Sequence, residues 1–112
     1  MKNKTSLASR LRHRIIIQTP VMVSDNVGGF TTTWVKFAQV WAEILPKNGD
    51  ERLLDEKLLT QKRVIITIRY MAGVTEKMRI IYTDRKFNIL SLCNPYEENI
   101  LLEIMAEEKT EY

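Results

Sequence analysis

The chain has 112 residues, of which 45% are hydrophobic and 28% are charged, and its formal net charge is +3. This length allows one domain with one modest core, and the composition is ordinary for a globular protein. The single cysteine, Cys93, excludes an internal disulfide, and no stretch approaches the ~18 apolar residues needed to span a membrane. The first twenty residues lack the apolar run of a secretory signal, so we expect a cytoplasmic protein.

Charge is distributed unevenly along the chain. The last sixteen residues carry six acids and one lysine, a net charge of −5, which leaves +8 for the remainder. Such polarity can steer a partner or a second copy of the chain, although two solvated ends would give the same pattern. We expect residues 1–10 to form a flexible basic arm. The cations that precede the first acid, Asp25, are Lys2, Lys4, Arg10, Arg12 and Arg14.

The first two strands are predicted around a glycine turn. Alternating side chains from His13 to Gln18 predict a strand that ends before Pro20. Residues 24–29 carry the clearest turn signal in the chain, because asparagine and paired glycines adopt positive φ at low cost. Thr31–Thr33 then begins a second strand, and the two strands form a hairpin.

Residues 34–45 carry two conflicting patterns. Apolar side chains recur at helical spacing across this segment, whereas the preceding threonines and the sequence Val40–Ile44 favour a strand. Trp34 and Trp41 are an odd number of residues apart, so one unbroken strand would direct them to opposite faces. A break near residues 37–38 would let both face the core. The pattern alone leaves helix and strand open, and the family resemblance given below favours two strands with an irregular join.

A short helix is predicted over about residues 51–60. Asp50 is a suitable N-cap, and Glu51 lies in the first turn, where the helix dipole favours acids. Leu54 and Leu58 share one face. Because the rest of the segment is strongly charged, docking of those leucines must supply most of its stability.

Residues 63–95 carry three consecutive strand patterns. Side chains alternate from Val64 to Tyr70, from Met78 to Tyr82 and from Phe87 to Ile89. The polar Thr83–Lys86 segment is short enough for a hairpin turn. Because strands adjacent in sequence usually pair, we predict an antiparallel meander.

Asn94-Pro95 ends the third of these strands, because proline supplies no ladder donor, and a final strand follows over residues 100–106. We therefore predict a mainly β fold, a small antiparallel β-barrel of six to seven strands with one short helix inserted at about 51–60. The barrel spans residues 11–108 and leaves residues 109–112 as a tail. The predicted core consists of Trp34, Trp41, Ile66, Ile68, Tyr70, Ile80, Tyr82, Phe87 and Ile89.

The residue types needed for catalysis are scarce. One histidine and one cysteine cannot form a Cys/His zinc site, and no HExxH motif is present. His13 is in phase with apolar positions, so we interpret it as a buried or rim histidine, and Cys93 as a small packing residue. The neighbouring carboxylate pairs lack the apolar surroundings that raise a pKa. We therefore predict no enzyme activity and no catalytic, metal or cofactor site.

Nucleic-acid binding is the main alternative function. Basic residues interleave with aromatic ones at Arg69-Tyr70 and from Tyr82 to Phe87, and a small barrel can present such residues as a stacking groove for a single strand. These aromatics, however, are in phase with aliphatic positions, which favours the core. A net charge of +3 is also small for a sequence-specific binder.

A series of short sequence pieces, each present once, follows a characteristic order over residues 7–108. The pieces are Leu11–Ile15, Gln18–Pro20, Asp25 followed by Gly28-Gly29, Thr33-Trp34, Val40–Ile44 with Pro46, Thr67–Tyr70, Gly73–Thr75, Met78–Ile80, Arg85–Ile89, Asn94-Pro95 and the acidic Glu107-Glu108. Their order and spacing resemble the head–tail joining proteins of tailed bacteriophages, also called head–tail adaptor or head-closure proteins. One departure is Thr83–Lys86, which lacks the glycine common in that turn, so the turn type stays open.

The resemblance implies a structural, non-enzymatic role. Such proteins are small β-barrels that assemble as a ring beneath the portal of a DNA-filled capsid, close the packaged head and provide the docking surface for the tail. The implied partners are the phage portal or adaptor protein, the tail completion protein and further copies of the chain, with packaged double-stranded DNA passing nearby. No cofactor and no membrane is implied. The protein would be found in the bacterial host cytoplasm during assembly and then in the virion connector.

We expect specific roles for two segments of the chain. The resemblance places residues 46–61 toward the channel, although a helix that caps one open end of the barrel would fit equally well. The charged residues of this segment are Lys47, Asp50, Glu51, Arg52, Asp55, Glu56 and Lys57. The basic arm and the residues directly after it are expected to dock on the portal or adaptor ring. The cations of this docking stretch are Lys2, Lys4, Arg10, Arg12 and Arg14.

Overall fold

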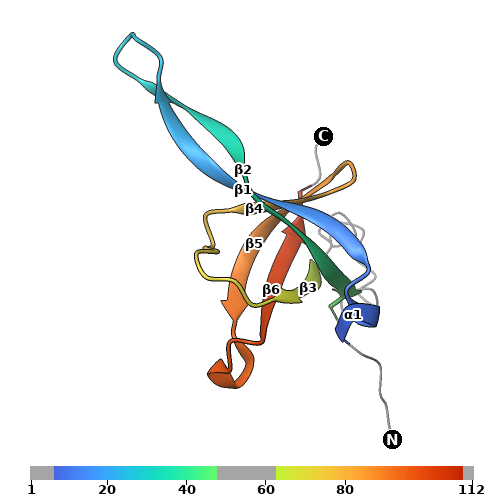
Figure 1. Cartoon of the computed structure of the whole chain (residues 1–112). Coiled ribbons are helices and arrows are strands. Elements are labelled where there is room, and N and C mark those ends of the chain that lie inside the picture. The colour runs from blue at the N-terminus through green and yellow to red at the C-terminus, as the bar shows by residue number, and fades with distance from the viewer. Residues whose placement is uncertain (1–6, 48–62, 110–112) are drawn as a thin grey trace, which may run out of the picture.

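The computed structural model describes residues 7–47 and 63–109 (Figure 1). The predicted helix at 51–60 and most of the predicted channel-facing residues lie outside these ranges. The described elements, in chain order, are α1 (Leu7–Arg10), β1 (His13–Ser24), β2 (Phe30–Pro46), β3 (Arg63–Arg69), β4 (Arg79–Tyr82), β5 (Arg85–Cys93), the 3-10 helix η3 (Pro95–Glu97) and β6 (Leu101–Glu108).

The six strands form one antiparallel sheet that closes on itself in the order β1-β2-β3-β6-β5-β4, with β4 paired back to β1. The prediction of a mainly β fold with six to seven antiparallel strands is confirmed. The predicted meander over residues 63–95 is wrong. β6 lies between β3 and β5, and β4 pairs with β1 and β5. The segment between β3 and β4 therefore crosses from one part of the closed sheet to another.

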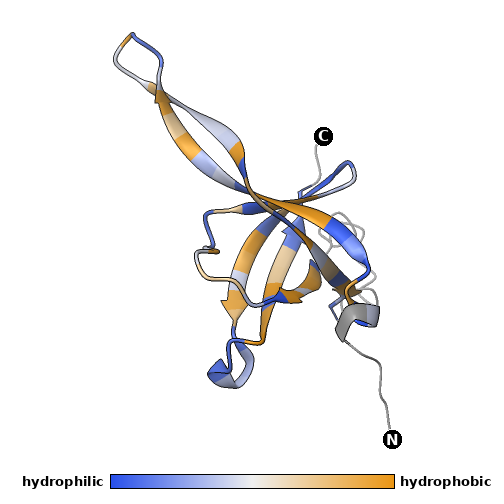
Figure 2. Cartoon of the chain, viewed as in Figure 1, coloured by the Kyte–Doolittle hydropathy of each residue, from blue (hydrophilic) through white to orange (hydrophobic). Residues whose placement is uncertain are grey.

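Buried apolar side chains of the strands form one cluster inside the closed sheet. Figure 2 shows how hydrophobic and hydrophilic residues alternate along the strands. Of the predicted core residues, Ile66, Ile68, Ile80, Phe87 and Ile89 are buried, and Phe87 is fully inaccessible to solvent. The fully buried aliphatic residues are mostly isoleucine, whose stiff branched side chains suit a pleated surface. Further members of the same cluster are Ile15, Ile17 and Ile104, with Tyr82 packed half-buried against it.

Tyr70 is half-buried and lies just beyond the end of β3, outside the buried cluster. Its backbone N–H donates to the Ile100 carbonyl at 3.0 Å. The prediction that Tyr70 belongs to the core is wrong, because the strand ends at Arg69 and the alternating pattern no longer fixes a side-chain direction.

β1 and β2 extend well beyond the closed sheet as a two-stranded arm, defined here as residues 19–36 (Figure 1). β4 pairs with β1 only over Ile16–Gln18, and β3 pairs with β2 only from Ala42 onward. The prediction that the first strand ends before Pro20 is wrong. In the arm β1 has a single neighbouring strand, and proline within a sheet is found on such edge strands, where one side of the backbone has no partner.

Residues 34–45 are strand, within β2. Ile17 pairs with Ala38 and Gln18 with Lys36, so Phe37 is the extra residue of a β-bulge, at the place where a break was predicted. The bulge shifts the alternation by one residue and brings Trp34 and Trp41 to the same face.

That shared face is the outer one. The predictions of Trp34 and Trp41 as core residues are wrong, because Trp41 is 50% exposed and Trp34 is half-buried on the arm. Inward positions next to Trp41 are taken by Val40 and the fully buried Ala42. The Arg79 guanidinium carbon lies 4.2 Å from the Trp34 ring centroid, which partly covers that indole from outside.

Both predicted hairpin turns are present. At the tip of the arm, the Asp25 carboxylate accepts hydrogen bonds from the N–H groups of Val27 and Gly29, both at 2.9 Å, and Gly28 has φ +90°. The second turn consists of Thr83 and Asp84 between β4 and β5, with Thr83 at φ +54°. The turn thus has two residues and places a non-glycine residue in the left-handed region.

Candidate interaction surface

The described residues offer little for catalysis. His13 is half-buried, its Nδ1 lies 2.8 Å from the Tyr82 hydroxyl, and the two rings meet edge to face. This agrees with the prediction of a rim histidine. Cys93 is exposed, so its interpretation as a packing residue is wrong. Within residues 7–47 and 63–109, no three His, Cys, Asp or Glu side chains are placed to share a metal ion. No helix in those ranges has the length and apolar character to cross a membrane.

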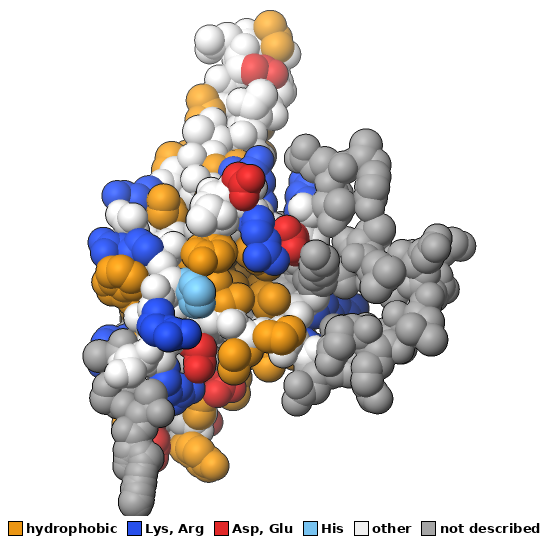
Figure 3. Space-filling model, turned by 90° about the vertical axis from the view of Figure 1, so that its right-hand side faces the viewer, with side chains coloured by type: hydrophobic (Ala, Val, Ile, Leu, Met, Phe, Trp, Pro, Cys, Tyr) orange, Lys and Arg blue, Asp and Glu red, His pale blue; other side chains and the backbone are white. Residues whose placement is uncertain are grey.

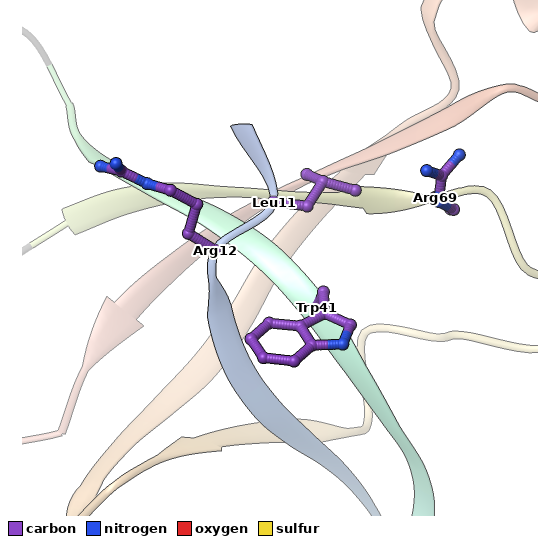
Figure 4. Close-up of a pocket in the computed structure, with 4 residues that line it drawn as sticks. All are labelled: Leu11, Arg12, Trp41 and Arg69. Carbon is purple, nitrogen blue, oxygen red and sulfur yellow. The ribbon is translucent and has the colours of Figure 1, made fainter. Parts of the chain in front are cut away.

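Trp41 forms part of a surface hollow, named here the Trp41 groove and lined by Leu11, Arg12, Trp41 and Arg69 (Figure 4). The groove has a volume of about 440 Å³. Leu11 is buried at the base of the groove, so the half-exposed indole supplies most of its apolar surface, while Arg12 and Arg69 lie on opposite sides of Leu11 in the view. A neighbouring hollow of about 320 Å³ shares Leu11, Trp41 and Arg69, so the depression continues along the surface.

The groove is strongly cationic. In addition to Arg12 and Arg69, the guanidinium carbon of Arg14 lies 5.0 Å from the Trp41 ring centroid. Arg14 and Trp41 are cross-strand partners in the β1–β2 pair, which explains their stacking. Two members of the predicted docking arm, Arg12 and Arg14, thus lie beside an indole and a third arginine. Trp41 was missed here because the indole was predicted to lie in the core, whereas Arg69 was named only beside Tyr70, for the alternative nucleic-acid function.

Arg10, another predicted docking residue, is held by Glu43. Its Nη2 lies 2.9 Å from Oε1 and its Nε 3.4 Å from Oε2. The hydrogen bond to the carboxylate, and then its charge, raise the pKa of the Arg10 guanidinium. The pair fastens α1 to β2. Lys2 and Lys4 lie outside the described residues.

The channel-facing prediction cannot be compared with the structure for most of its members. Lys47 is half-buried, and its N–H donates to the Arg63 carbonyl at 3.0 Å, which continues the β2–β3 ladder by one bond. The other six residues, Asp50, Glu51, Arg52, Asp55, Glu56 and Lys57, lie outside the described ranges. The assignment to a channel stays a prediction.

The arm is the second notable surface. Along one of its faces every residue is β-branched, because alternating positions on β1 (Thr19, Val21 and Val23) pair with Val35, Thr33 and Thr31 on β2. The arm also exposes large apolar side chains, visible along the projection in Figure 3. No core lies beneath them within the described chain. Exposed apolar side chains gathered on one element in this way mark an interaction site in many proteins.

Comparison with known proteins gives these surfaces a context. A family model described as phage head completion protein matches residues 7–109. A chain in the structure "Virion of native gene transfer agent (GTA) particle" is 26% identical with a TM-score of 0.68, covering 90% of this chain and 96% of that one. The solution structure of protein SF1141 from Shigella flexneri 2a is 26% identical with a TM-score of 0.71, covering 96% and 100%.

No match was found among curated proteins. The family model, however, spans nearly the whole chain, from α1 to the residue after β6. The chain therefore belongs to the phage head completion protein family.

Proposed function

We propose that this chain is a ring-forming connector subunit that joins the DNA-filled head to the tail and closes the packaged head. Its closed six-stranded sheet is the small β-barrel body of the subunit. The observation that carries the proposal is the arm, which projects from that body with exposed valine, methionine and phenylalanine side chains. A gathering of exposed apolar side chains on one projecting element is typical of a surface that another protein covers. Family membership and the likeness to a virion chain support the same role.

The proposed partners follow from the position of the charges. An ion pair between Arg10 and Glu43 fastens α1, the first described element, to β2. We assign the N-terminal residues to the portal or adaptor ring, and the remaining surfaces, the Trp41 groove included, to the tail completion protein and neighbouring copies. Residues 46–61 are assigned to the channel, through which double-stranded DNA passes. The role is structural and non-enzymatic, in the host cytoplasm during assembly and then in the virion.

Deletion of the gene from the phage or prophage that carries it tests the proposal. We expect DNA-filled heads without tails that lose their DNA on storage, and complementation by the full chain should restore tailed particles. Electron microscopy and nuclease sensitivity of the packaged DNA are the measurements. Normal yields of infectious, tailed particles after deletion would contradict the proposal.

The docking role of the N-terminal arm is tested separately. Removal of residues 1–10 should weaken co-sedimentation with portal-bearing heads and leave the thermal melt nearly unchanged. A matched control replaces the same residues by a neutral segment of equal length. Equal co-sedimentation of the full and truncated chains would refute this assignment.

One observation favours a second candidate function, the binding of single-stranded nucleic acid. Trp41 is half exposed and lies among Arg12, Arg14 and Arg69, which is the combination of stacking surface and positive charge that such proteins use. The aromatics first considered for this role are less available, because Phe87 is buried and Tyr82 contacts His13. Salt-sensitive binding of a generic oligonucleotide, lost in Trp41→Ala, would favour this second function.

A further inference from the structure

We infer that the tip of the arm of one subunit binds the Trp41 groove of the next subunit. The tip is defined as residues 24–30. The inference rests on the proposed ring-forming function and names the two surfaces that would meet in it.

The tip has the composition of a ligand for this groove. Between residues 20 and 35 the chain carries one charged side chain, Asp25. Val27 is 84% exposed and Phe30 is 65% exposed, so the tip presents apolar side chains next to a carboxylate. The N–H groups of Val27 and then Gly29 lower the pKa of Asp25, and the carboxylate is ionised at neutral pH.

The groove is complementary to the tip in both respects. The half-exposed Trp41 offers apolar surface, Arg12 and Arg69 line the groove with it, and Arg14 stacks over its ring. Tryptophan and arginine are the residues that most often dominate protein–protein binding energy when an apolar side chain covers them. Opposite charges on the two surfaces would set the register and discourage a tip-to-tip contact.

The two surfaces cannot meet within one subunit. The groove is lined by residues directly before β1, and the tip begins where β1 ends. β1 has 12 residues, and an extended strand of this length spans roughly 35 Å. A contact between them therefore joins two copies through different surfaces. A heterologous contact of this type produces a ring when its rotation closes.

The hairpin is well suited to such a contact because little needs to be ordered on binding. Asp25 accepts two backbone hydrogen bonds inside the turn, and the Asp25 N–H donates to the Gly29 carbonyl at 3.1 Å. The β-branched side chains along the arm have restricted rotamers. Preorganisation of this kind reduces the entropy lost on association.

Cysteine cross-linking of the full chain tests the inference directly. In a Cys93→Ser background, which removes the exposed native thiol, one protein carries Val27→Cys and a second carries Arg12→Cys. Mixed at high concentration with a short thiol cross-linker, they should give a covalent dimer. A chain that carries both cysteines should give a ladder of oligomers. Leu90→Cys, an exposed apolar position on β5, replaces Arg12→Cys in the control.

Charge variants provide the second arm of the experiment. Asp25→Asn retains a side-chain oxygen for the turn and removes the charge, so the cross-linked fraction should fall several-fold while the hairpin persists. Arg69→Glu should lower it similarly. Lys86→Glu, the same charge change at an exposed position on β5, should leave it unchanged. Thermal melts and the amide spectrum of the hairpin verify that each variant is folded.

The inference is overturned if Val27→Cys cross-links to the Leu90 position as readily as to the Arg12 position, or to neither. It is also overturned if Asp25→Asn and Arg69→Glu cross-link like the parent. The cross-linking and gene-deletion results together distinguish failure of this inference from failure of the proposed function. When cross-linking fails but gene deletion still yields untailed heads, the arm–groove contact is wrong and the connector role stands. When gene deletion leaves tailed particles intact, the connector role itself is refuted.

Discussion

The Arg14 guanidinium stacks over the Trp41 indole on the outside of the closed sheet, with 5.0 Å between the guanidinium carbon and the ring centroid. The two residues face each other across the β1–β2 pair. The contact lies beside a groove that three arginines surround, and it keeps a large aromatic surface in reach of a partner. Trp41, one of the two tryptophans of β2, therefore lies on the exterior of the protein.

Replacement of Trp41 by alanine should cost little stability. The indole is half exposed, and its main described contact is the stacked Arg14. We expect a loss of about 1 kcal/mol, the size of an exposed cation–π contact with some packing. Truncation of a core tryptophan would instead lower the free energy of unfolding by ~3–5 kcal/mol. Equilibrium urea unfolding measures the change, and a loss in the core range would contradict the exposed position.

Phe87→Ala is the matched core variant. Phe87 is fully buried on β5 and is the largest of the fully buried side chains. Its truncation removes apolar contacts and leaves a cavity inside the closed sheet, so we expect a loss of ~3–5 kcal/mol. The same urea series that measures Trp41→Ala provides the value. Equal effects of the two variants would show that the inner and outer faces have been assigned wrongly.

Alanine substitutions at two glycines distinguish the cost of backbone strain from the cost of a steric contact. Gly28 (φ +90°) and Gly73 (φ +98°) both adopt a conformation that disfavours a side chain. A Cβ at Gly28 would meet nothing within 4 Å, whereas at Gly73 it would lie 3.1 Å from Cζ of Phe37. We expect Gly28→Ala to cost about 1 kcal/mol by strain alone.

Gly73→Ala should cost more than Gly28→Ala, because the Phe37 ring must also move. Phe37 is the bulged residue of β2, so a shift of its ring should be reported by the amide signals of neighbouring β2 residues. The difference between the two unfolding free energies measures the contact. A larger loss at Gly28 than at Gly73 would contradict this packing.

Acid should weaken the tip of the arm. The folded-state pKa of Asp25 is lowered by hydrogen bonds from the N–H groups of Val27 and then Gly29. A group with a lowered folded pKa contributes stability above its unfolded pKa, and that contribution is lost as pH falls through the folded value. We therefore expect the turn to loosen only below the ordinary range of an aspartate pKa.

An NMR titration of the Val27 and Gly29 amides measures this effect. In the parent chain their shifts should follow the protonation of Asp25 below the ordinary aspartate pKa. In Asp25→Asn the chemical shifts of the same amides should remain nearly constant over that pH range, because the turn then has no titrating side chain. An Asp25 titration at or above the ordinary value would show that the two hydrogen bonds do not favour the ionised form.

Local patterns predicted the strands and turns where a few neighbouring residues decide the backbone. Alternation over His13–Gln18 and Val64–Arg69 predicted strands that the structure contains, and the asparagine and glycines after Asp25 predicted the turn at the tip. The isoleucines of β3 were assigned to the core because an alternating apolar face is stabilised by burial.

Residue order alone did not decide which strands pair or which face of β2 is buried. The insertion of β6 between β3 and β5 depends on hydrogen bonds between strands far apart in the sequence, and period-two alternation is compatible with several strand orders. Alternation likewise places residues on a common face without saying which face is inside. The bulge at Phe37 and the aliphatic residues that already fill the interior turned Trp34 and Trp41 outward. Only the tertiary structure decided that Trp41 lies outside, because the interior of the closed sheet has room for a limited volume of side chains, and that Trp34 lies on an arm with no core beneath it.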